Sequence, residues 1–432
     1  MKESLPKVLF VLGLMLVAFG YGVTAMLNNL FPAGLIRDAT ATYADLRQHW
    51  RNDLGLEPTR LLEPARHPGA GVTVRDEARM QPGPTWLAGM FDSEMGARLI
   101  EADGSLIHSW PISYTEIWPD VGALSDGTPV TDWNVFVHGG LALPDGSIVF
   151  TFDTGQSLVK LDACGEVVWK SKRMFHHSVD RAEDGTYWLP LADHIAQVAE
   201  GGETLQQIWF PKLIREAGEY GVYFIQQPQR TDGHANDVEV LSAELAPAFP
   251  LFEAGDVLYS LRDINLVLVF DPVSKRIKWY QHGPWLRQHD PDFMADGRIS
   301  IFDNRTTYDA SRIVAIDPVT RATETLYEGT PEHPFYSSIR GKHQHQPNGN
   351  LLITEAPAGR VFEVTPAGEI VWEYINRYDE DRVLVVANAI RYPPDYFDFA
   401  TWPENSRSRR EHSKLPVSKA VNTNCGIIRS DN

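Results

Sequence analysis

Cysteine is nearly absent from the 432-residue chain, which contains only Cys164 and Cys425. Two widely separated cysteines exclude a CxxC-type structural zinc site and a disulfide framework, and they leave open whether the two pair with each other. Basic residues are also few, because 39 Lys and Arg face 57 Asp and Glu and give a formal net charge of −18. A surface this acidic repels phosphate backbones, so we expect no nucleic-acid partner.

Phosphate-binding loops are missing too, since the chain has neither a Walker sequence nor a GxGxxG at a strand–helix junction. The residues that are abundant point to strands. The chain is 43% hydrophobic and 11% aromatic, with 33 Gly and 29 Pro available for turns. This composition is typical of a globular protein with a sizeable core and excludes disorder, collagen and coiled coil.

The amino terminus contains an uncharged apolar stretch from Val8 to Phe31, preceded by Lys2 and Lys7. About 20 apolar residues span a bilayer, and lysines before the span place the first residues inside. We therefore expect residues 1–31 to be an uncleaved single-pass anchor in the inner membrane, with the rest of the chain in the periplasm. The alternative is a signal segment cleaved near residues 23–25, which leaves a soluble periplasmic protein.

The exported part divides into three segments. Residues 32–84 read as a polar stalk or linker with a short helix, and residues 401–432 as a C-terminal tail. Between them, in residues 85–400, a unit recurs in which a turn is followed by a short β-branched run that ends in an aromatic residue. The six closing aromatics are Trp110, Trp169, Trp209, Trp279, Tyr327 and Trp372.

Most of these runs follow a hydrophobic partner strand across a DP, TPAG or DACG turn, as in SLVKLDACGEVVW. Further turn-plus-strand segments such as LPDGSIVFTF and PNGNLLITE bring each unit to four antiparallel strands. The pattern predicts an all-β fold, a six-bladed β-propeller with four-stranded antiparallel blades. An open β-sandwich explains the alternation but not the recurring unit. We expect residues 387–399 to supply the strand that joins the last blade to the first.

Histidines occupy equivalent positions in the predicted blades. His138, His177 and His289 each stand eight residues before the glycine of a turn. His234 opens the corresponding strand of another blade, and His343 opens that of the last blade, shifted by two residues. Strand starts have no intrinsic need for imidazole, so we expect these side chains to converge at one mouth of the central channel.

Converging imidazoles suit either a transition metal or an anion that one ring attacks as nucleophile. Two nearby residues favour the anion. Asn236 points to the same side as His234 and adds a neutral donor, and Arg262 lies within an apolar strand of that blade. An arginine repels a bare divalent metal but grips a tetrahedral oxyanion, unless it merely pairs with a carboxylate such as Asp263. We expect no metal and no cofactor. The rivals are an iron oxygenase with four histidine ligands and a non-enzymatic, membrane-anchored binding propeller.

At these residues the chain resembles the bacterial arylsulfate sulfotransferases, exported six-bladed propellers that use no nucleotide sulfate donor. The resemblance covers about residues 130–400. It is carried by GHANDVEVL (233–241), YSLRDINLVLVFD (259–271), RQHDPDFMADGRISIFDN (287–304), HQPNGNLLITE (345–355) and ANAIRYPPDYF (387–397).

The resemblance implies that a histidine attacks the sulfuryl group of an aryl sulfate, and that a phenol then collects the group from a sulfohistidine. The nucleophile falls on His289, and the sulfate-gripping residues fall on His234, Asn236 and Arg262. A further channel histidine falls on His177, with His176 as the alternate. The register argument adds His138 and His343 to the substrate-binding set, and His177 or His234 is expected to protonate the leaving oxygen.

Overall fold

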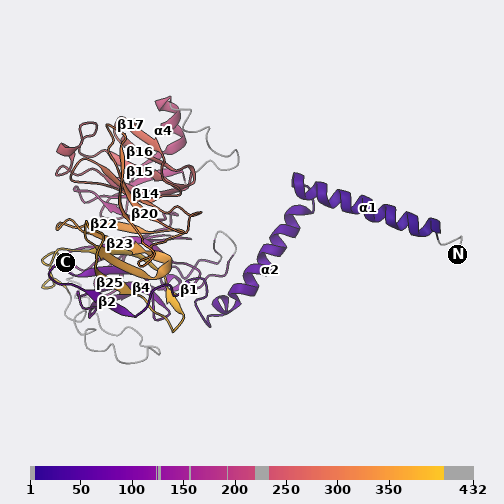
Figure 1. Cartoon of the computed structure of the whole chain (residues 1–432), viewed down its shortest axis with the longest axis horizontal. Coiled ribbons are helices and arrows are strands. Elements are labelled where there is room, and N and C mark those ends of the chain that lie inside the picture. Colours follow the sequence, from indigo (N-terminus) through magenta and orange to yellow (C-terminus); the bar gives the residue numbers. More distant parts are fainter. Residues whose placement is uncertain are drawn as a thin grey trace, which may run out of the picture. The chain divides into compact units, whose positions relative to one another are not determined.

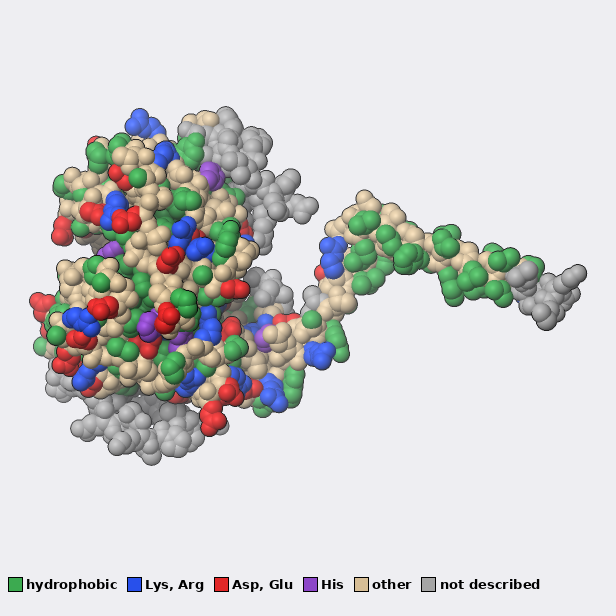
Figure 2. Space-filling view, viewed as in Figure 1, with side chains coloured by type: hydrophobic (Ala, Val, Ile, Leu, Met, Phe, Trp, Pro, Cys, Tyr) green, Lys and Arg blue, Asp and Glu red, His purple; other side chains and the backbone are tan. Residues whose placement is uncertain are grey.

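The computed structural model describes residues 5–122, 124, 128–154, 157–191, 193–218 and 233–402 (Figure 1). The chain divides into two compact units, Met1–Arg60 and Leu61–Asn432. In the first unit, α1 (Leu5–Asn28) is followed by α2 (Ala33–Asp53), and hydrophobic side chains run along α1 (Figure 2). Within α1, the 23 residues Pro6–Asn28 are long and apolar enough for a membrane span or a signal segment. Helix α2 has 21 residues and is longer than the short helix expected in the linker.

The second unit is a six-bladed β-propeller of antiparallel sheets, which confirms the predicted fold (Figure 1). The blade that closes the ring has the order β27 (Val386–Arg391), β3 (Thr85–Phe91), β4 (Glu94–Ile100) and β5 (Leu106–Pro111). The next two are β6 (Val137–Ala142), β7 (Ile148–Phe152), β8 (Leu158–Leu161), β9 (Val167–Ser171), and β10 (Asp180–Arg181), β11 (Tyr187–Pro190), β12 (His194–Val198), β13 (Thr204–Trp209).

The remaining blades follow the same order. They are β14 (Ala235–Val240), β15 (Val257–Leu261), β16 (Leu266–Asp271), β17 (Arg276–His282), then β18 (His289–Phe293), β19 (Ile299–Asp303), β20 (Arg312–Ile316), β21 (Thr323–Glu328), then β22 (Lys342–His345), β23 (Leu351–Glu355), β24 (Arg360–Val364), β25 (Ile370–Ile375). Short helices α3 (Tyr114–Ile117) and α4 (Phe210–Ala217) lie in the connections.

The propeller unit begins earlier than residue 85. Strand β1 (Leu62–Pro64) pairs with β26 (Arg382–Leu384), and β2 (Gly71–Arg75) adds a fifth, outer strand beside β25. The segment expected to be linker therefore contributes two strands to the propeller.

The ring closes through the C-terminal part of the chain. Strand β27 is the innermost strand of the blade that β3 begins, as the sequence predicted for residues 387–399. Tyr392 and Tyr396 continue the closure into the next blade, where their hydroxyls bond the backbone N–H and C=O of Ala142 at 2.8 and 2.9 Å.

The six closing aromatics all lie in the fourth strand of their blades. Three of them also bond the next blade: the indole N–H of Trp110, Trp169 and Trp372 donates to the carbonyl of Gly146, Glu200 and Ala102 at 3.0, 2.9 and 2.8 Å. Buried indoles usually find such a partner, and here the bond ties neighbouring blades together. The aromatic repeat in the sequence thus marks the seams of the ring.

Candidate functional site

The innermost strand of each blade delivers the channel side chains. His138 lies in β6, His289 opens β18, His234 immediately precedes β14, and His177 lies three residues before β10. The pairing register shifts at the start of β6, β14 and β18, and such bulges re-aim side chains. His177 and His234 have φ of 68° and 55°, a left-handed conformation that non-glycine residues avoid and that clusters at functional sites.

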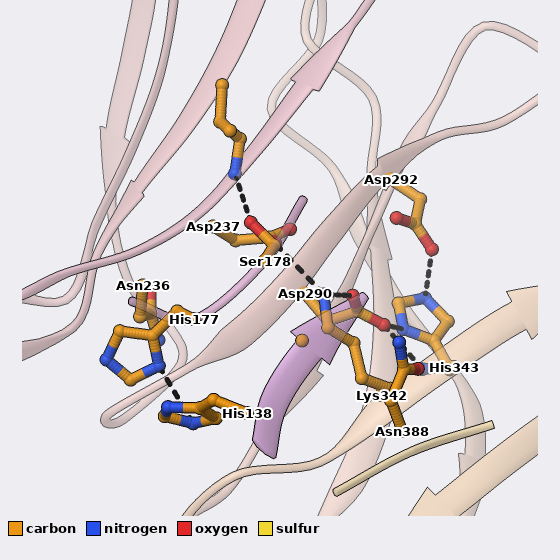
Figure 3. A network of polar contacts seen from close by, with 12 residues as sticks. His138, His177, Ser178, Asn236, Asp237, Asp290, Asp292, Lys342, His343 and Asn388 are labelled. Atoms are coloured by element: carbon orange, nitrogen blue, oxygen red, sulfur yellow. Dashed lines mark hydrogen bonds and ion pairs between the residues drawn. The ribbon is translucent and has the colours of Figure 1, made fainter. Parts of the chain in front are cut away.

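Three imidazoles form a hydrogen-bonded chain. His177 Nδ1 lies 3.0 Å from His138 Nε2, and His177 Nε2 lies 2.9 Å from His234 Nε2. Figure 3 shows the pair of His138 and His177. A neutral imidazole donates from one nitrogen and accepts at the other, so in the neutral chain all donors point the same way. Burial lowers the pKa of His177 well below its usual value, and the neighbouring His138 adds to the shift.

The hydrogen-bonded chain of imidazoles depends on a close approach between two blades. A Cβ at Gly139 would lie 2.2 Å from the carbonyl oxygen of His177, so β6 reaches that carbonyl only because residue 139 is glycine. The hydroxyl of Thr151 donates to the same carbonyl at 2.6 Å. The sequence His138-Gly139 therefore brings His138 and His177 together. Of the two candidates His177 and His176, it is His177 that bonds both His138 and His234 in the imidazole chain. The His176 ring stacks edge-on against His177, with centroids 4.5 Å apart.

The ring of His289 is held in a different way, by the side-chain amide of Asn304. Its Nδ1 lies 2.7 Å from Asn304 Oδ1, while the Asn304 amide nitrogen donates to the carbonyls of Ser337 and Arg340 at 2.8 and 2.6 Å. Because two carbonyls fix the amide, its oxygen faces His289 and requires a proton on Nδ1. Nε2 therefore carries the lone pair, and it is buried with no hydrogen-bond partner among the described residues. Burial lowers the pKa of His289 to about 3, so the ring is neutral at physiological pH.

Asn236 and Arg262 stand beside this imidazole. The Asn236 amide nitrogen donates to the carbonyl of Gln288 at 2.7 Å, one residue before His289. The Nε of Arg262 lies 3.0 Å from Asp263 Oδ1, the carboxylate pairing that the sequence offered as the alternative to an anion role. Arg262 is nevertheless 6% exposed, and its charge contributes to the lowered pKa of His289.

A cavity with an open mouth lies beside His289 and holds about 270 Å³ of atom-free space, part of it open to solvent; neither His234 nor Arg262 is among the residues that line it. Its lining includes His138, His177, Asn236 and His289. It also includes Arg340, which the sequence did not single out and which lies 3.4 Å from Asp153. A tetrahedral anion placed here would meet imidazole, amide and guanidinium donors at once.

His343 does not join the imidazole cluster. The eight-residue count from Gly349 falls on Gly341, and two further residues along a strand carry His343 about 6.6 Å down the channel. There its Nδ1 lies 2.9 Å from Asp290 Oδ2 and its Nε2 lies 2.8 Å from the Ser300 hydroxyl. His343 therefore belongs to a second, larger pocket of about 960 Å³, contrary to the expected convergence of all five histidines.

Lys342, Asp290 and Ser178 line both pockets and form the wall between them. The Lys342 ammonium bridges Asp290 and Asp237, at 2.9 Å from the latter (Figure 3). Carboxylates dominate the second pocket. Burial raises the pKa of Asp180 to about 7, and burial with the nearby Asp290 raises the pKa of Asp292 well above its usual value. The channel thus runs from neutral imidazoles to partly protonated carboxylates.

The ligand atoms of Asp290, Asp292 and His343 all lie within 4.8 Å of one another, as in a metal site. Each side chain already has a protein partner, however: Asp290 pairs with Lys342 and His343, and His343 Nε2 lies 3.5 Å from Asp292. Among the described residues, His138, His177, His234 and His289 do not make such a set. They bond to one another or to Asn304 instead of pointing at a common centre.

Sequence reasoning missed Asn304, Arg340 and Lys342. Asn304 ends the motif FDN, and its role depends on a contact with a residue fifteen positions earlier. Arg340 and Lys342 flank Gly341, the position that the eight-residue count marks in the last blade. The same count that selected the histidines would have found the two cations, had it not been shifted to reach His343.

One comparison with known protein families matches part of the propeller. Residues 226–377, about a third of the chain, match the family model of the arylsulfotransferases (ASST). No curated protein matches. Solved structures with a similar fold include a protein of unknown function from Bacteroides caccae, with a TM-score of 0.49, 11% identity, and coverage of 71% of this chain and 98% of that one.

Two further similar structures are named enzymes. Hydrazine synthase of Kuenenia stuttgartiensis has a TM-score of 0.41 and 12% identity, covering 69% of this chain and 80% of its own. Virginiamycin B lyase of Staphylococcus aureus has a TM-score of 0.37 and 14% identity, covering 56% and 70%. The family match agrees with the resemblance seen in the sequence, since residues 226–377 are similar to the arylsulfotransferase family model.

Proposed function

We propose that the protein transfers a sulfuryl group from an aryl sulfate to a phenol through a sulfohistidine at His289. The observation that carries the proposal is the buried Nε2 lone pair of His289, which the Asn304 amide fixes on a ring that lines a cavity with several donors. A neutral imidazole with a fixed tautomer is a ready nucleophile.

In the first half-reaction, His289 Nε2 bonds to sulfur as the bond from sulfur to the phenolic oxygen breaks. Negative charge on the sulfuryl oxygens is stabilised by Asn236, Arg262 and Arg340, in the manner of a phosphoryl transfer. The leaving phenolate takes a proton from the imidazole chain of His138, His177 and His234. The bound sulfate anion raises the pKa of these rings by Coulomb attraction, which makes protonation possible despite burial.

In the second half-reaction, the acceptor phenol returns a proton to the imidazole chain as its oxygen attacks the sulfur. The bond from sulfur to His289 Nε2 breaks, and the ring is again neutral with its proton on Nδ1. Asn304 holds this proton in both halves, since its oxygen accepts from Nδ1 before and after transfer. The cycle needs no metal or nucleotide.

The test is the intact mass of the full chain after brief exposure to 4-nitrophenyl sulfate, with phenol release followed in parallel. We expect a gain of about 80 Da, the sulfuryl group of a covalent intermediate, mapped to His289. His289→Gln should lose both signals, and the matched control His333→Gln, at an exposed position, should keep both. No mass gain and no phenol release, or both retained in His289→Gln, would overturn the proposal.

A further inference from the structure

Helix α2 carries a stripe of exposed apolar side chains along one face. Ile36, Tyr43, Leu46 and Trp50 recur at spacings of seven, three and four residues, which places them on one face. Their exposed fractions are 49%, 67%, 54% and 43%. Contiguous apolar side chains exposed to this degree mark an interaction surface.

The acidic side of α2 is already in contact with the segment that follows the helix. Both guanidinium nitrogens of Arg60 bond the carboxylate of Asp45, at 2.9 and 2.7 Å, and one lies 3.9 Å from Asp53. His49 Nδ1 lies 3.0 Å from the Thr59 hydroxyl. The acidic side of the helix is therefore neutralised within the unit, and the apolar side is left for a partner.

Charge is distributed unevenly between the two sides. With about 100° of rotation per residue, Arg37, Arg47 and Arg51 fall along one flank of the apolar stripe, whereas Asp53 falls on the other flank and Asp45 on the far face. The Arg51 guanidinium lies 5.4 Å from the centre of the Trp50 ring, at the boundary between stripe and flank. Arginines beside an apolar face suit the surface of an anionic bilayer, where acyl chains lie beneath negatively charged headgroups.

We propose that α2 lies flat on an anionic phospholipid surface, with the apolar stripe among the acyl chains and the arginines at the phosphates. Tyr43 and Trp50 suit the headgroup level, where aromatic rings with a polar edge are enriched. Helix α1, the apolar span, ends at Asn28, and α2 begins at Ala33, so the bilayer surface is within reach. This makes α2 an interfacial helix rather than a stalk, and it goes beyond the proposed function without resting on it.

A second copy of the protein could also cover this face, because the spacing of seven, three and four residues is that of a coiled coil. In such a coiled coil, Tyr43 and Trp50 would lie at core positions where paired helices prefer Ile or Val. The aromatic content of the stripe and its basic flank therefore favour lipid.

The test is hydroxyl-radical footprinting of the full chain in nanodiscs that hold one copy each. The discs contain phosphatidylcholine alone, or with one third replaced by phosphatidylglycerol. We expect oxidation of Tyr43 and Trp50 to slow about tenfold with the anionic lipid, since each arginine strengthens surface binding roughly fivefold. Oxidation of Tyr308, a propeller residue with 64% exposure, should not change and serves as the internal reference.

Arg47→Gln/Arg51→Gln should restore fast oxidation on the anionic discs. The matched control, Lys172→Gln/Arg173→Gln, removes two positive charges from an exposed propeller loop and should leave the protection intact. Equal oxidation rates in the two lipids would overturn the proposal. Discs loaded with two copies give a further check. Protection that appears only in these discs would also overturn the proposal and assign the face to a second chain.

Discussion

His289 Nδ1 and Asn304 Oδ1 lie 2.7 Å apart, and this contact decides which nitrogen of the imidazole carries the lone pair. Asn304 belongs to the end of the strand pair that His289 begins, and its own amide is held by two backbone carbonyls. The tautomer of His289, the proposed nucleophile, is thus set through Asn304 by the backbone of the loop at residues 337–340.

Replacing Asn304 should expose this control. Asn304→Leu removes the acceptor and should lower kcat/KM by about tenfold to a hundredfold, the cost of one lost buried hydrogen bond. Asn304→Asp keeps an acceptor and should retain more activity at pH 8. Its negative charge should raise the pKa of His289 from about 3 and move the acidic limb of the pH–rate profile toward neutrality. Superimposable profiles for wild type and Asn304→Asp would show that the contact does not govern the nucleophile.

Removing the Arg262 side chain should slow catalysis without unfolding the blade. The backbone N–H of Arg262 donates to the carbonyl of His234 at 3.0 Å, and that bond survives Arg262→Ala. We expect kcat to fall by about a hundredfold to a thousandfold, as for the loss of one oxyanion donor, with little change in Tm. Asp263→Asn keeps the guanidinium and is the control. Equal losses in both variants would assign Arg262 to a structural ion pair.

The carboxylate pocket predicts an unusual pH dependence of stability. The pKa of Asp180 is raised to about 7 in the folded protein, whereas the unfolded chain releases the proton near pH 4. Between these values the folded state holds the extra proton, so this group reduces stability as the pH rises, by up to about 1.4 kcal/mol per pH unit. The Tm of Asp180→Asn relative to wild type should therefore increase from pH 5 to pH 8. Asp395→Asn, at an exposed site, should show a flat difference.

Ring closure depends on a buried ion pair. Arg391 in β27 contacts Glu363 in β24, with both side chains fully buried, and also donates to the Thr85 hydroxyl at 3.0 Å. Arg391→Leu leaves a buried carboxylate without its partner and should cost about 3–5 kcal/mol in the free energy of unfolding, measured by urea denaturation. Arg391→Leu/Glu363→Leu should recover most of the loss. A double variant as unstable as the single one would mean that packing, not charge, dominates this contact.

Much of the fold could be predicted because its signals are local. A turn glycine, an alternating strand and a closing aromatic are each read within a few residues, and Trp110 and Trp372 lie in fourth strands. The residue at which the propeller begins was harder to predict from the sequence. Strands β1 and β2 are short, and only their partners β26 and β25, three hundred residues away, identify them.

The sequence by itself determined the repeat, the N-terminal apolar helix and the register that brings His138, His177 and His289 to the first pocket. These follow from strand period and turn spacing, which neighbouring residues specify. Only the tertiary structure decided that Asn304 fixes the tautomer of His289, that Arg340 lines the pocket and that His343 lies beyond the wall formed by Lys342 and Asp290. Each of those outcomes depends on distances between side chains of different strands, and the closure of the ring sets such distances.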